Sequence, residues 1–267
     1  MIMTGRTCAF CGSSRDLTRE HLWPAALHSR LMEASNSPRN AFWLRRVAAE
    51  IEGEPTVRDV CQPCNNGPLS ELDSYICALF DRYFVRIVAR HQLIQFHYDY
   101  HLLARWLLKM CFNSARIHSS VDLFAYAPLR EYIRGSSLSN SRSVQVFAQL
   151  SYPGLIPPER MSAPELLDSP AIWEPQENRV GLLHFETRGV GRKILRAVHL
   201  RSYSFFVAFF EPSEKRSTAK EFADNFLSGM KASVLLSPSR PVVDLVCNGS
   251  DAWLSADGAR DNQFVSQ

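Results

Sequence analysis

Cys8-Ala-Phe-Cys11 and Cys61-Gln-Pro-Cys64 decide how the N-terminal part of this chain folds, and 49 residues separate them. In each pair, two thiolates from one tight turn can reach the same ion. Two such pairs supply the four soft, tetrahedral ligands that a structural Zn²⁺ prefers. The sequence therefore predicts a zinc site that stabilises the N-terminal segment (residues 1–74), which has little hydrophobic core of its own. A thiol redox pair is the alternative interpretation.

Between and after these cysteines lie residues that can do chemistry. Glu20 stands beside His21 in the run Glu20-His-Leu-Trp-Pro24, and Asn65 and Asn66 follow the last cysteine. The combined order Cys-x-x-Cys, acid-His-x-x-Pro, Cys-x-x-Cys-Asn resembles the HNH (His-Me finger, ββα-metal) endonuclease superfamily, in its variant with two zinc-binding knuckles. The resemblance covers about residues 5–74.

This resemblance implies a role for each of these residues. His21 is the expected general base, and an imidazole titrates in the range useful near neutral pH. Glu20 and Asn65 are expected to hold one catalytic divalent cation, Mg²⁺ or a similar ion, because carboxylate and amide oxygens are hard ligands. Asn66 competes with Asn65 for this place. The sequence departs from the family at Glu54-Pro-Thr-Val57, where many members carry a central asparagine, and in having asparagine for the last histidine.

Each of these residues also has a purely structural interpretation. His21 alone is typical of a hydrogen-bonded residue near a knuckle. Asn65 or Asn66 suits the cap of a helix that starts near Pro68. Thr18 and Asp59 are expected to contact the catalytic residues and hold them in position.

Positive charge is concentrated in the middle of the chain, although the net charge of all 267 residues is only +3. Residues 75–142 contain 9 Lys+Arg against 4 Asp+Glu, whereas residues 1–74 contain 8 Arg against 9 acidic residues. A basic surface can bind the nucleic-acid backbone, although a solvated helix face has the same composition. The candidate phosphate-binding residues are Arg82, Arg86, Arg90, Arg105, Lys109 and Arg116.

Hydrophobic periodicity predicts an α+β fold in three segments: a zinc-stapled ββα-metal finger (1–74), a basic helical segment (75–142) and a β-rich region (143–267). Apolar residues recur at helical spacing after Pro68 and again from Asp99 to Arg116, and a further helix is expected from Thr218 to Lys231. The predicted strands are Val144–Leu150, Val180–Glu186, Ile194–Leu200, Tyr203–Phe210 and Val242–Val246. The Ile194–Leu200 and Tyr203–Phe210 strands are close enough to form a hairpin. Cys77, Cys111 and Cys247 are expected in the core.

Taken with the resemblance, these features predict a metal-dependent endonuclease that cuts DNA, of the kind found in bacterial defence systems or mobile elements. The alternative is a non-catalytic zinc-finger module that binds nucleic acid or protein, which would need no Glu-His pair. With neither a secretory signal nor a membrane-length apolar run, a cytoplasmic protein is expected. The C-terminal region is expected to form the contacts of a homo-oligomer or to bind a regulatory partner.

Overall fold

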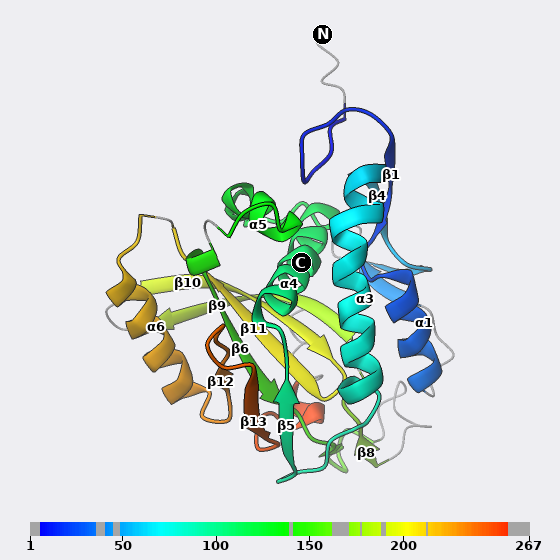
Figure 1. The fold of residues 1–267 in the computed structure, drawn as a ribbon. Coiled ribbons are helices and arrows are strands. Elements are labelled where there is room, and N and C mark those ends of the chain that lie inside the picture. Colours follow the sequence, from blue (N-terminus) through cyan, green and yellow to red (C-terminus); the bar gives the residue numbers. More distant parts are fainter. Residues whose placement is uncertain are drawn as a thin grey trace.

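The computed structural model describes residues 6–35, 41–44, 49–138, 141–161, 171–176, 178–187, 191–211 and 213–255. Helices and strands are both abundant, which confirms the α+β prediction (Figure 1). The polar residues after Gly258, which the sequence predicts to form a frayed tail, lie outside the described residues. A search of the described helices for a segment able to span a lipid bilayer finds none.

The N-terminal third contains the β1–β4 pair and the helices that follow it. Its elements are β1 (Leu17–His21), α1 (Ala25–Ala34), β2 (Ala41–Leu44), β3 (Ala49–Glu52), β4 (Thr56–Cys61) and α2 (Gln62–Cys64). The helical path continues through η2 (Asn65–Leu69), α3 (Ser70–Leu79) and η3 (Phe80–Phe84). A kink at Gly67 separates α2 from α3, and the predicted apolar stripe of this helix is buried at Leu69, Leu72 and Ile76.

The middle of the chain is dominated by one long helix. Its elements are β5 (Leu93–His97), α4 (Tyr100–Ile117), η4 (Leu123–Leu129), α5 (Arg130–Arg134) and η5 (Ser141–Ser143). Asp99 caps α4, since its side chain accepts a hydrogen bond from the Leu102 N–H at 2.9 Å. The predicted inner residues of this helix, among them Trp106 and Met110, are fully buried.

A five-stranded antiparallel sheet forms the C-terminal half, in the order β12-β6-β11-β10-β9. Its strands are β6 (Val144–Leu150), β9 (Asn178–Thr187), β10 (Gly191–Leu200), β11 (Tyr203–Phe209) and β12 (Val234–Leu235). The remaining elements are β7 (Gly154–Leu155), β8 (Ile172–Trp173), α6 (Arg216–Gly229) and β13 (Val242–Val246). The predicted hairpin is confirmed, because β10 and β11 pair directly through Leu200 and Tyr203.

Helices cover both faces of this sheet (Figure 1). Alternate residues of β11 point to opposite faces, as the strand geometry requires. Phe205 and Val207 join the large cluster that contains α3 and α4, whereas Phe206 and Ala208 pack with Phe222 and the rest of α6. The large cluster runs from Cys8 to Cys247, so that all three predicted segments contribute to one core.

A buried ion pair links the sheet to Asp122, the residue directly before η4. The Arg196 guanidinium of β10 donates to both carboxylate oxygens of Asp122, at 2.7 and 2.6 Å, and both side chains are almost fully buried. Burial raises the pKa of Asp122, but the guanidinium lowers it by more, to below its ordinary value. The stability that this pair contributes is therefore present above the ordinary aspartate pKa and is lost as the pH falls below it.

Breaking this pair on one side is expected to destabilise the protein strongly. An Arg196→Met variant leaves the buried Asp122 carboxylate without its positively charged partner, so we expect the free energy of unfolding at neutral pH to fall by about 3–5 kcal/mol. The matched double variant R196M/D122L removes both charges and should recover most of the loss. Denaturant unfolding followed by circular dichroism measures both values. Equal losses in the single and the double variant would contradict this account.

Candidate functional site

Four cysteine sulfurs form a compact cluster at the N-terminal end of the structure. The Sγ atoms of Cys8, Cys11, Cys61 and Cys64 all lie within 4.8 Å of one another, and those of Cys11 and Cys61 are 3.5 Å apart. A tetrahedral zinc with bonds of about 2.3 Å places its sulfurs about 3.8 Å apart, whereas a disulfide needs about 2.05 Å. The four thiols therefore fit a zinc ion and are too far apart to be disulfide-bonded, and the cluster can hold zinc.

Backbone geometry shapes both knuckles around this position. Gly12 adopts a left-handed φ of +80° directly after Cys11, and its N–H donates to the Cys8 carbonyl at 2.9 Å. The second knuckle ends β4 and begins α2, with Pro63 in the first turn of that short helix. Burial raises the pKa of the Cys8 thiol, but backbone N–H groups around it, led by that of Cys61, lower it by more, to about 7. Such a thiol readily releases its proton when it binds a cation.

The β1–β4 pair connects this cluster to the predicted chemical residues. The strands are antiparallel, with Arg19 opposite Arg58 and His21 opposite Thr56. A register shift between Thr18 and Arg19 leaves Asp59 as an extra residue on β4. Since neighbouring residues of a strand face opposite sides, Glu20 and His21 project in opposite directions. Glu20 is buried, whereas the His21 side chain is 45% exposed.

Glu54 holds the His21 ring in place. One Glu54 oxygen lies 2.9 Å from His21 Nδ1, and its other oxygen accepts a hydrogen bond from the Trp23 N–H. The Glu54 side chain is 8% exposed, and burial raises its pKa, against the lowering effect of His21. A carboxylate on Nδ1 fixes the proton on that nitrogen, so that Nε2 is the ring's acceptor. The half-exposed imidazole can then accept a proton from a substrate or water.

Glu20 has other partners. Its Oε1 lies 3.0 Å from Lys109 Nζ and accepts a hydrogen bond from Asn113 Nδ2 at 3.1 Å. Lys109 is 1% exposed and also donates to both oxygens of Asp73, each at 2.7 Å. Burial raises the pKa of Asp73 to about 6, although Lys109 acts to lower it. A divalent cation that binds Glu20 would have to displace the Lys109 ammonium group or share the carboxylate with it.

The two candidate asparagines differ in their surroundings. Asn65 is partly buried, and its Nδ2 donates to Thr18 Oγ1 at 3.0 Å and to the Arg19 carbonyl at 3.4 Å. Thr18 Oγ1 in turn donates to the Val60 carbonyl. Asn66 is exposed. Asn65 therefore ties the start of the helical segment to β1, and neither asparagine uses its side chain to cap a helix.

The predicted phosphate-binding residues divide into two groups. Arg82, Arg86 and Arg90 are exposed. By contrast, α4 turns Lys109 toward Glu20, and Arg116 pairs with Asp59 and lies over the Phe10 and Phe112 rings, with its charged group 5.3 and 4.9 Å from their centroids. The half-buried Arg105 donates to the Ile133 carbonyl at 3.0 Å. The positive charge of α4 is thus directed into the protein, because α4 is its central helix.

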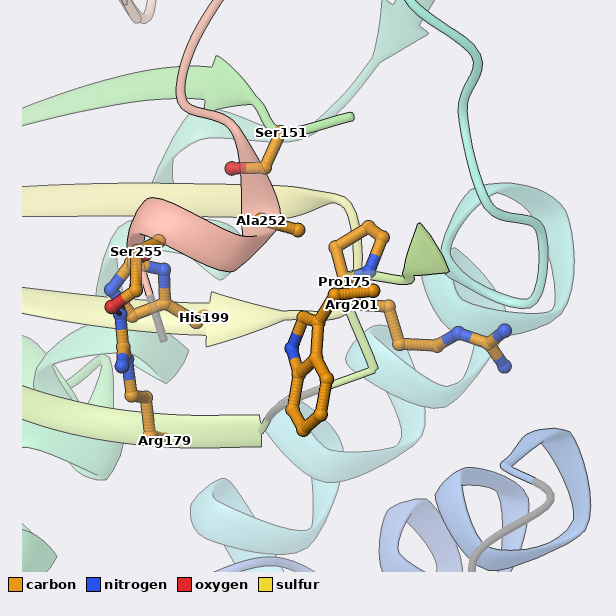
Figure 2. Close-up of a pocket in the computed structure, with 8 residues that line it drawn as sticks. Ser151, Pro175, Arg179, His199, Arg201, Ala252 and Ser255 are labelled. Carbon is orange, nitrogen blue, oxygen red and sulfur yellow. Dashed lines mark hydrogen bonds between the residues drawn. The ribbon is translucent and has the colours of Figure 1, made fainter. Parts of the chain in front are cut away.

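Two pockets lie away from His21. The first lies where β9 begins and β10 ends, and there Figure 2 shows His199, Arg179 and Ser255 together and the Arg201 side chain extending away from them. Two of its polar side chains already have partners, since Arg179 donates to Ser255 Oγ at 2.8 Å and His199 contacts Ser204 Oγ, outside the lining, at 2.8 Å. Burial lowers the pKa of His199 to about 3. The second, between α3 and β5, contains only Arg82 of the predicted residues.

Comparison with protein-family models, with curated proteins and with solved structures found no match.

Sequence reasoning did not identify three residues that shape this site. Glu54 stands in the region where relatives carry asparagine, and nothing in the sequence indicates that it contacts the ring of His21. Asn113 donates to both Glu20 and the His21 carbonyl, and Asp73 completes the contacts of Lys109. Asn113 and Lys109 are four residues apart and share one face of α4. Only the Lys109–Asn113 spacing is visible in the sequence, and it does not indicate which strand they contact.

Proposed function

We propose that this chain is a nuclease that hydrolyses phosphodiester bonds in DNA, with His21 as its general base. The observation that supports this most strongly is the contact between the half-exposed His21 ring and the buried Glu54 carboxylate. A base must accept the proton of an attacking water molecule, and a carboxylate on Nδ1 leaves Nε2 free for this purpose. The order of motifs that resembles HNH endonucleases supports the choice of phosphodiester as substrate.

The zinc ligands have a structural role in this proposal. Cys61 ends β4, the strand that pairs with the one carrying His21, and Cys64 follows it in α2, so that zinc would hold the β1–β4 pair against the first knuckle. The catalytic divalent cation that the resemblance implies, at Glu20 with Asn65 or Asn66, stays a prediction. No step of the proposal passes through it.

Cutting of supercoiled plasmid is the direct test of this function. The zinc-loaded chain is expected to nick the plasmid, and parallel reactions with and without Mg²⁺ or Mn²⁺ determine whether a second metal is needed. If no condition yields nicking while the protein still retards a DNA duplex in a gel, the non-catalytic binding module is the better description. That alternative is favoured by one observation: the Glu20 carboxylate is already engaged by Lys109.

Glu54→Gln tests whether the His21–Glu54 contact matters for catalysis. The amide keeps an oxygen for the Trp23 N–H, but its NH₂ group would donate to Nδ1 and favour the wrong tautomer of the ring. We expect kcat for nicking to fall about 10- to 100-fold with little change in KM. Glu52→Gln, at an exposed position two residues away, is the matched control and should cut like the wild type. Equal rates for the two variants would remove Glu54 from the mechanism.

A further inference from the structure

The exposed face of the β1–β4 pair carries two arginines beside His21. Arg19 and His21 are two residues apart on β1 and share one face of the strand, as do Thr56 and Arg58 on β4. Arg19, Thr56 and Arg58 are exposed and His21 is half-exposed, whereas the intervening Glu20 is buried. Two guanidinium groups and the proposed base therefore belong to the same surface.

The arrangement of these arginines is unfavourable for the fold alone. Arg19 is directly opposite Arg58 in the register, and like charges at such positions destabilise a strand pair. Arg58 Nε donates to the Leu17 carbonyl at 3.1 Å. Within the described part of the chain, neither guanidinium forms an ion pair with a carboxylate. A pair of cations without a counter-charge on the surface indicates a site for an anion from outside.

The buried face of β1 has the opposite arrangement. There Lys109 supplies a cation to Glu20 and Asp73, so that the internal carboxylates are already compensated. On the other side of the strand, next to His21, Arg19 and Arg58 provide positive charge that could meet a substrate. The planar guanidinium group of arginine matches the oxygens of a phosphate and can bind them through two hydrogen bonds.

We propose that Arg19 and Arg58 bind the phosphate backbone of DNA on the face of the β1–β4 pair that carries His21. This inference rests on the proposed function for its choice of ligand, and it adds the residues that hold the scissile strand at the base.

Binding of a fluorescein-labelled 20-base-pair duplex, measured by anisotropy at several salt concentrations, tests this inference. The zinc-loaded His21→Ala chain serves as the background, which keeps the duplex intact. Loss of two phosphate contacts in R19Q/R58Q should weaken binding at least about 10-fold and reduce the slope of log K against log salt by about 2. The control R216Q/K220Q removes the same charge from exposed positions of α6 and should change neither.

Thermal unfolding of the same variants separates binding from a structural role. Removing two opposed like charges should leave the melting temperature of R19Q/R58Q equal to or above that of its background. A melting temperature well below the background, or a salt slope equal to that of the α6 control, would overturn the proposal. The two proposals fail separately, because a chain that binds through these arginines but never nicks plasmid contradicts only the nuclease activity.

Discussion

A Cys61→Ser chain is expected to lose its bound zinc and to unfold its N-terminal lobe. Cys61 contributes one of the four sulfurs, and it also ends β4, so that its loss affects both the metal site and the strand pair. Structural zinc sites in small fingers contribute roughly 10–16 kcal/mol of apparent binding free energy, which is also folding free energy. Phe10, between the first pair of cysteines, packs edge-on against Phe112 of α4 at a ring distance of 5.2 Å. Unfolding of the lobe would therefore expose part of the main core.

Zinc content and thermal unfolding together measure this effect. The wild-type chain should release about one zinc on treatment with a thiol reagent, and Cys61→Ser should release almost none. Its melting temperature should fall by on the order of 10 °C, as expected when several kcal/mol are lost from a chain of this size. Cys77→Ser is the matched control, because Cys77 is buried in α3 outside the cluster and should leave zinc content unchanged. A Cys61→Ser chain that retains one zinc would contradict the proposed ligand set.

A His21→Ala chain is expected to keep its fold and zinc but to cut plasmid about 100- to 10,000-fold more slowly. General base catalysis typically contributes a factor of this size, and within the proposed mechanism no other described side chain takes the place of the ring. The substitution should cost little stability, since the His21 side chain is 45% exposed. The loss should therefore be seen in kcat and not in the amount of folded protein.

Initial nicking rates at equal zinc content measure this loss. His184→Ala is the control, because His184 is an exposed histidine of β9 that contributes to no proposed site. It should cut at the wild-type rate. If His21→Ala retains more than half of the wild-type rate, His21 is not the base, and the nuclease proposal loses the observation that supports it most strongly.

Local patterns in the sequence predicted a large part of the fold. The strands Val144–Leu150 and Val242–Val246 were predicted with the bounds that the structure shows, and α4 differs from its prediction by one residue at each end. Each of these elements has a strong periodicity of its own. β5 was not predicted, because only Phe96 of its five residues is fully buried and its partner β13 begins about 150 residues later. A strand that depends on such a distant partner carries little signal in its own residues.

The sequence by itself identified the four cysteines of a cluster that can hold zinc, because the spacing of a Cys-x-x-Cys pair is a local property and two such pairs suffice for one ion. It also identified His21 and Glu20 as neighbours, but not that they face opposite sides of β1. Only the tertiary structure placed Glu54 on the His21 ring and Lys109 on Glu20, from 33 and 89 residues away. The physical reason is that charge pairing across a core depends on how α4 packs against the β1–β4 pair, and residue spacing along the chain does not specify that packing.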